Sequence, residues 1–255
     1  MGVRLTANPG TYSPAGPNVA YQWLRGTTVI PGAVSATYVP TAADLRATLG
    51  VRVTASRAGY TSYSATSPQT AIVRPGTLVS TAPPTISGAA RVGSRLTATA
   101  GRWSNAAELT YQWYASGRAI PRATSPTYTP TSDILGDRVR VRVTARQSGF
   151  TAAAASSVNT PSVTAGSITF STAPKISGNL SQGSILRLVR GTTTPSTATV
   201  RYQWLRDGKA ITGATGTSRR IKSGDGGRKL SVRVTATAPG HMKLVVLTRA
   251  RRASR

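Results

Sequence analysis

The sequence predicts an all-β protein built from three antiparallel sandwiches in tandem. Two observations carry this prediction: a set of motifs that recurs three times in 255 residues, and hydrophobic residues that alternate with polar ones. The interval between copies is 90 and then 91 residues. Repetition at a fixed period is the sequence signature of repeated structural units. The recurring motifs are Tyr-Gln-Trp at 21–23, 111–113 and 202–204, and Val-Arg-Val-Thr-Ala at 51–55, 141–145 and 232–236.

These motifs divide the chain into three repeats, which we expect to be separate domains. Inside each repeat the hydrophobic period is two, as in the run where Val139, Val141 and Val143 alternate with arginines. Such alternation is typical of a strand with one buried face. Gly, Pro, Ser and Asn interrupt these runs at short intervals, which indicates turns. A repeat of about 90 residues with short strands and frequent turns is typical of a β-sandwich. The predicted domains are 1–75, 76–165 and 166–255.

The Tyr-Gln-Trp motifs are expected to supply the core. Alternate residues of a strand point to the same face, so Tyr and Trp should both point inward, where an indole can fill the space between two sheets. Gln22 and Leu24 should then point outward, as should Leu205 in the third repeat. The predicted core residues are Tyr21, Trp23, Tyr111, Trp113, Tyr202 and Trp204.

The repeat resembles a known family. Its pattern, P-x-I-S-G, G-x-x-L-T-A, G-x-W-S, Y-Q-W, T-Y-x-P-T and V-R-V-T-A, is similar to the tandem immunoglobulin-like repeats of secreted and cell-surface proteins of actinobacteria. The second repeat fits best. The third departs from the pattern, because Arg219 and Ile221 replace Tyr and Pro, and Thr193 stands where the second repeat has Trp103. The resemblance implies immunoglobulin-like sandwiches that act as a spacer, adhesion or wall-association module, with no catalytic residues.

The composition argues against most kinds of enzyme. The chain has no cysteine, so it has neither disulfides nor thiolate metal sites. General acid and base chemistry needs carboxylates or histidines, and few are present. We expect the aspartates to bond to turn backbone and His241 to cap a hairpin, and we expect no catalysis, metal or cofactor. The candidates are Asp44, Glu108, Asp133, Asp137, Asp207, Asp225 and His241.

Positive charge is the clearest functional lead. The sequence has 32 Lys and Arg against 6 Asp and Glu, a net charge of +26. The three repeats carry +5, +6 and +15, so the third repeat holds more than half of the excess. A positive field attracts polyanions. The alternative is that an arginine-rich composition only keeps the surface soluble and protects strand edges. The predicted polyanion-binding residues are Arg219, Arg220, Lys222, Arg228, Lys229, Arg249, Arg251 and Arg252.

A second candidate surface is a sheet face that every repeat presents in the same way. If Tyr and Trp point inward, the residues between them and those between the valines of the neighbouring strand point outward. Repetition of one face along the chain gives avidity for a repetitive polymer. The alternative is a solvated face without a ligand. The residues of this predicted face are Gln112, Tyr114, Arg142, Gln203 and Arg233.

These observations predict a non-enzymatic, extracellular spacer or adhesion module. Its expected partner is an anionic wall polymer or polysaccharide, and we expect a monomer without a membrane span. Two alternatives remain: a polyanion or nucleic-acid binder that uses the third repeat, and the accessory region of a secreted hydrolase. Nucleic acid is the weaker partner, because most aromatic residues fall at core or turn positions instead of forming stacking platforms.

The first repeat is expected to be incomplete at its N-terminus. Leu5 aligns with Leu96, so the repeat begins inside a strand and lacks the equivalent of residues 80–91. A sandwich without that strand would expose a sheet edge and part of its core. We therefore expect the reading frame upstream of Met1 to encode a P-x-I-S-G segment, and farther back either more repeats or a catalytic domain behind a secretion signal.

Overall fold

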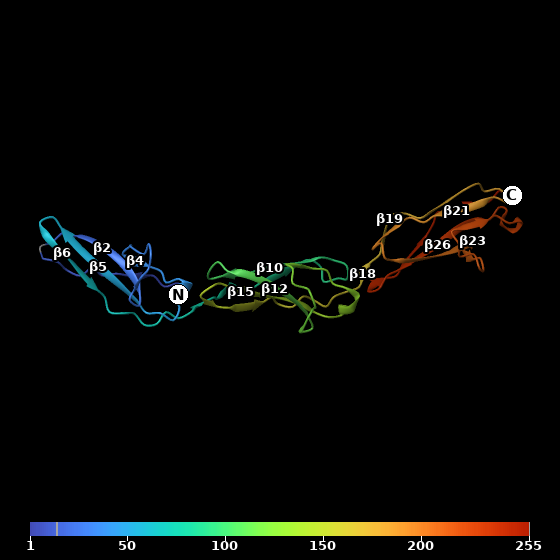
Figure 1. Cartoon of the computed structure of the whole chain (residues 1–255). Helices are drawn as coiled ribbons and strands as arrows, with labels where there is room; N and C mark the ends of the chain where they lie inside the picture. Colours follow the sequence, from blue (N-terminus) through green and yellow to red (C-terminus); the bar gives the residue numbers. More distant parts are fainter. Residues whose placement is uncertain (14, 255) are drawn as a thin grey trace. The chain divides into compact units, whose positions relative to one another are not determined.

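The computed structural model describes residues 1–13 and 15–254, and it is an all-β protein of three immunoglobulin-like sandwiches (Figure 1). Every sheet takes its strands from one of three consecutive sets, β1 to β6, β7 to β17 and β18 to β29. We call these sets the first, second and third sandwich. The only helices in the described chain are three short 3-10 turns, and none of its helices is long and apolar enough to cross a membrane.

The first sandwich pairs β3-β2-β5-β6 in one sheet and β1-β4 in the other. The long strands β2 and β5 run antiparallel over their full length, with Trp23 opposite Val51. From Val51 onward β5 alternates buried and more exposed residues, as a half-buried strand requires, whereas β2 buries the adjacent Trp23 and Leu24. Its elements are β1 (Leu5–Thr6), β2 (Asn18–Arg25), β3 (Thr28–Val29), β4 (Thr37–Tyr38), η1 (Ala42–Asp44), β5 (Leu49–Arg57) and β6 (Tyr60–Thr66).

The second sandwich contains the four-stranded sheet β13-β12-β15-β17 and the three-stranded sheet β14-β10-β9. Two short pairs, β11-β8 and β16-β7, join its first segment to the rest. Its elements are β7 (Gly76–Thr77), β8 (Ser80–Ala82), β9 (Thr85–Ser87), β10 (Leu96–Thr99), β11 (Arg102–Trp103), β12 (Glu108–Ala115), β13 (Arg118–Ala119), β14 (Thr127–Tyr128), η2 (Ser132–Ile134), β15 (Val139–Arg146), β16 (Phe150–Thr151) and β17 (Ala153–Ser156).

The third sandwich repeats this arrangement with β24-β23-β26-β28 facing β20-β21-β25, and a last strand, β29, also pairs with β26. Its elements are β18 (Gly166–Ser167), β19 (Thr169–Thr172), β20 (Lys175–Ser177), β21 (Ile185–Val189), β22 (Thr192–Thr194), β23 (Thr199–Arg206), β24 (Lys209–Ala210), β25 (Ser218–Arg220), η3 (Ser223–Asp225), β26 (Lys229–Thr237), β27 (His241–Met242), β28 (Leu244–Leu247) and β29 (Arg251–Arg252).

Strand pairing and spatial grouping divide the chain differently. Grouping by close Cα positions gives two units that cut through the second sandwich, so the boundaries at 75/76 and 165/166 remain a prediction. The units are Met1–Thr85 with Thr99–Gln112 and Arg142–Ser157, and Ile86–Ala98 with Trp113–Val141 and Val158–Arg255.

The tryptophan of each Tyr-Gln-Trp motif lies in the core. Trp23, Trp113 and Trp204 are 3%, 0% and 0% exposed. The indole N–H of Trp113 donates to the Ser125 carbonyl at 2.8 Å, and the other two make the equivalent bond at 2.9 Å. The preceding tyrosines are half-buried beside the tryptophans. Each indole therefore both fills the space between the sheets and ties its sheet to the loop that leads to the opposite one.

On the strands that carry the tryptophans, the residues of the outer face are less exposed to solvent than the alternation predicts. Leu24 and Leu205 were expected to face solvent, and this is wrong, because they are 7% and 1% exposed. In the first sandwich the reason is local. Leu24 lies opposite Gly50, and the Gln69 side chain covers that glycine so closely that a Cβ there would overlap it.

A buried carboxylate accompanies the tryptophan in the first sandwich. The Asp44 side chain is fully buried and accepts hydrogen bonds from Arg25 Nε (2.8 Å), the Tyr38 hydroxyl (2.8 Å) and the Thr41 backbone N–H (2.7 Å). Burial by itself would raise the pKa of the Asp44 carboxyl, but these three donors outweigh it and hold that pKa below its ordinary value of 3.8. Arg25 and Asp44 correspond to Ala115 and Ile134 in the second sandwich.

Replacing Trp113 tests how much the second sandwich depends on its indole. Trp113→Ala should lower the free energy of unfolding of this sandwich by about 3–5 kcal/mol, because it leaves a large cavity in a small core. Native-state hydrogen exchange of the β15 amides in the full chain measures this loss. The exposed Arg118→Ala is the control and should change exchange little. Equal losses for both substitutions would contradict the central role of the indole.

Acidification should weaken the first sandwich through Asp44. A carboxyl whose pKa is lowered by folding stabilises the folded state above the unfolded pKa, and this contribution disappears as the pH falls through the folded pKa. We therefore expect amides of β5 to lose protection progressively below pH 3.8. Asp44→Asn should remove this part of the pH dependence.

The chain itself supplies the matched control for that experiment. The double variant Arg25→Ala with Asp44→Ile copies the second sandwich, where the ion pair is replaced by two apolar residues. Such replacement is often neutral for stability. The double variant should keep the neutral-pH stability and lose the acid-dependent part. An unchanged acid dependence would show that Asp44 is not its source.

Candidate functional site

Basic side chains lie together at one end of the larger sheet of the third sandwich. Arg206 lies opposite Lys209 across β23 and β24, and Lys229 lies opposite Arg252 across β26 and β29. Since β23 also pairs with β26, four neighbouring strands bring their basic residues to the same end. We call this group the basic end; it consists of Arg206, Lys209, Arg228, Lys229 and Arg252.

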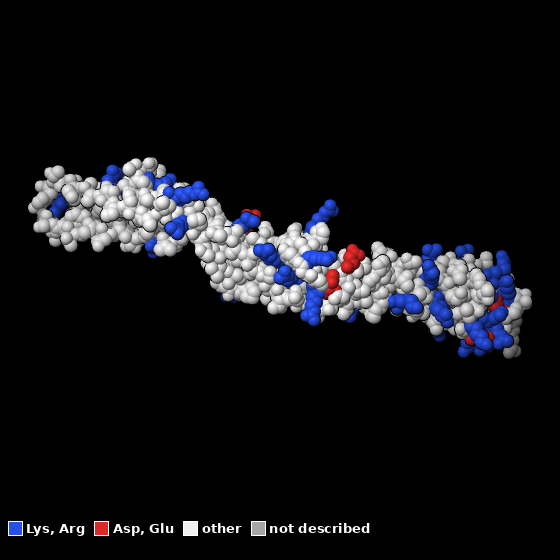
Figure 2. All heavy atoms as spheres, turned by 90° about the horizontal axis from the view of Figure 1, so that it is seen from below, with Lys and Arg blue, Asp and Glu red and all other residues white. Residues whose placement is uncertain are grey.

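The basic end borders an open hollow. Basic, acidic and apolar residues from the β23–β24 hairpin, from η3 and from the start of β26 line it. Figure 2 shows Lys and Arg side chains gathered over the part of the molecule that carries the third sandwich. The hollow is open, so it suits a chain molecule that lies across the surface better than an enclosed small ligand. The lining residues are Arg206, Asp207, Lys209, Ala210, Ile211, Gly224 and Arg228.

Two aspartates lie near these cations, and both are engaged. Asp207 is exposed, and the Lys229 backbone N–H and Arg228 lower the pKa of its carboxyl. Asp207 Oδ2 lies 3.1 Å from Arg228 Nη1. Asp225 is fully buried and pairs with Arg219 at 2.8 Å and with Arg206 at 3.4 Å. Five basic side chains therefore share one exposed carboxylate, so the basic end keeps a net positive charge.

The structure separates the predicted polyanion-binding residues into groups. Arg228, Lys229 and Arg252 belong to the basic end. Arg219 does not form part of an exposed surface: its side chain is 9% exposed and turned to Asp225. The Arg220 guanidinium donates to the Gly183 carbonyl at 2.7 Å, and Lys222 is exposed at the start of η3.

The last arginines lie elsewhere. Arg249 and Arg251 line a second hollow with Lys175, and Arg251 donates to the Gly178 carbonyl at 2.9 Å. Arg255, the remaining arginine of the basic tail, lies outside the described residues. Clustering in sequence therefore predicted only part of the clustering in space.

Arg206 and Lys209 are members of the basic end that sequence reasoning missed. They flank the Asp207-Gly208 turn in the run Leu-Arg-Asp-Gly-Lys-Ala. An Asp-Gly pair between strands predicts a tight hairpin, which places the residues on either side of it opposite each other. This signal was present in the sequence, but the pairing of Lys229 with Arg252 was not readable there.

The predicted repeated sheet face is only partly open. Arg142 and Arg233 are exposed. Gln203 is half-buried, and its amide donates to the Ile211 carbonyl at 2.7 Å, so it ties the strand to a loop instead of facing solvent. Tyr114 is half-buried under the Arg140 guanidinium, which lies 5.1 Å from the ring centroid. Gln112 is also half-buried.

Asp133, Asp137 and His241 have structural partners, and Glu108 is exposed at the start of β12. Asp137 accepts a hydrogen bond from Ser116 at 2.6 Å, and Asp133 lies in η2 beside Ser132. His241 lies in β27, where its Nδ1 is 2.8 Å from the Pro239 carbonyl. Within residues 1–13 and 15–254 no group of three or more His, Cys, Asp or Glu side chains is placed to hold a metal ion.

No protein-family model and no curated protein matches the sequence. Among solved structures, three N-terminal domains of the outer capsid protein Hoc of bacteriophage RB49 match 96% of this chain and 91% of their own, at 15% identity and a TM-score of 0.26. An adhesin of an Antarctic bacterium matches 94% of this chain and 66% of its own, at 12% identity and a TM-score of 0.31. The insect immune protein hemolin matches 96% and 70%, at 14% identity and a TM-score of 0.30.

Proposed function

We propose that the chain is a non-enzymatic spacer or adhesion module of the cell exterior, whose third sandwich binds an anionic wall or matrix polymer through the basic end. The observation that carries this proposal is the register of β24, β23, β26 and β29, which brings basic residues of four strands to one end of the sheet, where Arg206, Lys209 and Arg228 line an open hollow. The proposal includes the predicted domains 1–75, 76–165 and 166–255.

Electrostatics supplies the attraction. A surface with several cations and one exposed carboxylate attracts a polyanion over a distance set by the ionic strength, about 10 Å at 0.1 M salt. Arginine and lysine side chains that lie side by side contribute little to the stability of the fold, because their charges repel each other. An anion relieves that repulsion when it binds. Arg206 remains 44% exposed although it pairs with Asp225, so it can contact a ligand without leaving its partner.

The described residues of the third sandwich favour a polymer of carboxylate or phosphate groups over nucleic acid. Readers of single strands place exposed aromatic rings beside a basic groove, on which bases stack. In residues 166–254 the aromatic residues Phe170 and Tyr202 are half-buried and Trp204 is buried. Charge without a stacking platform suits an anionic polymer that has no bases.

The core also fits a module that carries load. The described chain holds its sandwiches by packing around tryptophans, with neither cysteine nor a clustered metal site. Antiparallel strands that pair over eight residues, as β23 and β26 do, resist separation because many hydrogen bonds must break together. The extracellular location and the wall polymer rest on the resemblance of the repeat pattern.

Binding of inorganic polyphosphate and of polygalacturonate to the full chain tests the proposal. The triple variant Lys209→Gln, Lys229→Gln and Arg252→Gln should bind both polymers about tenfold more weakly in 50 mM salt. A plot of log K against log salt should also become less steep, because fewer counterions are released. These side chains are exposed, so the fold should remain intact.

A charge-matched variant separates the basic end from the overall charge. Arg102→Gln, Arg118→Gln and Arg146→Gln remove the same charge from exposed positions of the second sandwich and should leave most of the affinity. Equal losses for the two triple variants would show that only net charge matters. Tighter binding to single-stranded DNA than to both polymers would instead support the nucleic-acid alternative.

A further inference from the structure

The outward face of the larger sheet differs between the third sandwich and the other two. In β26 the buried residues alternate with Arg233 and Thr235, so these two point outward. Residues opposite each other on paired strands point to the same face. Leu247 and Val245 of β28, which lie opposite Arg233 and Thr235, therefore point outward too, as does Arg201 of β23. We call Arg201, Arg233, Val245 and Leu247 the apolar-basic face.

The other two sandwiches have smaller, uncharged side chains at three of these four positions. Pairing with the neighbouring strand identifies the equivalents of Val245 and Leu247, and the repeat period identifies those of Arg201. The arginine at 233 is the one residue that all three sandwiches share. The equivalents are Ser64 and Thr66 in β6, Ala154 and Ser156 in β17, and Ala20 and Thr110 for Arg201.

The two aliphatic side chains are open to solvent. Val245 is 47% and Leu247 is 60% exposed, and Met242, just before β28, is 56% exposed. Val245 and Leu247 are two residues apart on the end strand of the sheet in the described chain, so they lie next to each other. Single exposed apolar residues are common on proteins, whereas a group of them indicates an interaction site.

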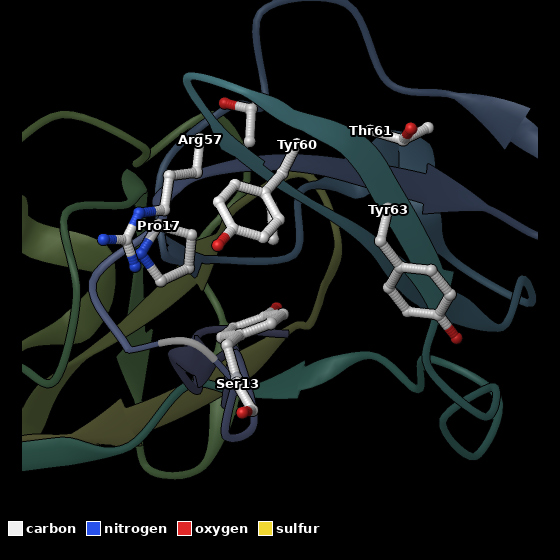
Figure 3. A pocket seen from close by; sticks show the side chains of 9 residues that line it. Ser13, Pro17, Arg57, Tyr60, Thr61 and Tyr63 are labelled. Atoms are coloured by element: carbon white, nitrogen blue, oxygen red, sulfur yellow. The ribbon is translucent and has the colours of Figure 1, made fainter.

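The first sandwich gives a contrasting case. It also exposes a large side chain beside its larger sheet, but that side chain has partners within the molecule. Tyr60 begins β6, and in Figure 3 its ring lies beside Pro17 and Arg57 in a hollow. The Arg57 guanidinium lies 5.7 Å from the centroid of that ring. The aliphatic side chains of β28 project from an outward sheet face instead.

Cations surround these aliphatic side chains. Arg233 lies directly opposite Leu247. The described residues of the third sandwich include two acidic side chains, Asp207 and Asp225, and both are paired with arginines near the basic end. A partner of the apolar-basic face must therefore offer negative charge next to an apolar phase. The exposed cations are Arg201, Arg233 and Lys243.

A second copy of this chain does not fit the face. It would bring together two third repeats of net charge +15 each, with arginine against arginine. Addition of another strand along β28 is also disfavoured, because Lys243 precedes and Arg249 follows the strand, and charged residues at a sheet edge oppose pairing. A fluid lipid layer accommodates projecting side chains without a matching pocket.

We propose that the apolar-basic face docks on a lipid surface with anionic headgroups. Val245 and Leu247 enter the boundary between headgroups and acyl chains, and the three cations contact the headgroups. Binding at such an interface grows with the apolar area that is buried and with attraction to anionic lipid.

This docking is separate from polymer binding by the basic end. The basic end lies at the start of β26, with Lys229, whereas Thr235, the residue opposite Val245, lies near the end of that strand. A lipid surface and a polymer can therefore bind the third sandwich together.

Flotation of the full chain with vesicles tests the inference. The vesicles contain equal parts of phosphatidylglycerol and phosphatidylcholine, in about 0.15 M salt. Val245→Ala with Leu247→Ser copies the second sandwich, so the fold accommodates both residues, and every charge is kept. This double variant should bind the vesicles about tenfold more weakly, because less apolar area leaves water. It should bind polyphosphate as the unchanged chain does.

The opposite sheet of the same sandwich supplies the matched control. Ile185 and Val189 of β21 are 44% and 40% exposed, but Arg220 and Lys175 lie directly opposite them, and the stems of such side chains cover apolar neighbours. Ile185→Ser with Val189→Ala should therefore change vesicle binding little.

A dye reports which face meets the lipid. The chain has no cysteine, so Leu247→Cys carries a single environment-sensitive label. Its emission should shift to the blue on the anionic vesicles, whereas the same label on Ile185→Cys should not shift.

Four results would overturn the inference. Equal weakening by the two double variants, or a blue shift from both labels, would show that net charge holds the chain on the vesicles in no fixed orientation. Equal loss of polyphosphate binding in the Val245 and Leu247 variant would assign the face to the polymer site. A dimer in sedimentation without lipid, lost in that variant, would show that a second copy covers the face.

Discussion

The hydrogen bond from a buried indole to a loop carbonyl is the interaction on which each sandwich depends. Trp23, Trp113 and Trp204 each occupy the centre of the long strand of the larger sheet, and each donates to a carbonyl twelve residues further along. A buried N–H without a partner costs free energy, so the loop must return to the indole. Because that loop leads into the opposite sheet, the position of the indole sets how the two sheets face each other.

The sandwiches differ in the residues that accompany this hydrogen bond. In the first and third sandwiches a buried aspartate, Asp44 or Asp225, is satisfied by arginine and by a backbone N–H. In the second sandwich Ala115 and Ile134 occupy the equivalent positions, without charge. Breaking a buried pair on one side is costly, whereas exchanging both partners for apolar residues is tolerated. The chain contains both end states of that exchange, which explains how one fold accommodates either set.

Strand ends place basic residues of four neighbouring strands side by side in the third sandwich, and this creates the basic end. This surface responds to salt because its attraction is between charges.

The sequence by itself determined the all-β class, the threefold repeat and the tryptophans of the core, because the period of two and the recurring aromatic motifs are local properties. Of the basic end it supplied Arg228, Lys229 and Arg252. It grouped them with Arg219, which the structure buries against Asp225.

Only the tertiary structure decided which charges share a surface and which neutralise each other. The register of β26 against β29 joins residues more than twenty positions apart in sequence, and no local pattern fixes that register. Burial of Leu24 and Leu205, and the turn of the Gln203 amide to a loop carbonyl, depend in the same way on segments that pack from elsewhere. Periodicity determines the two faces of a strand, but what covers each face depends on where the rest of the chain passes.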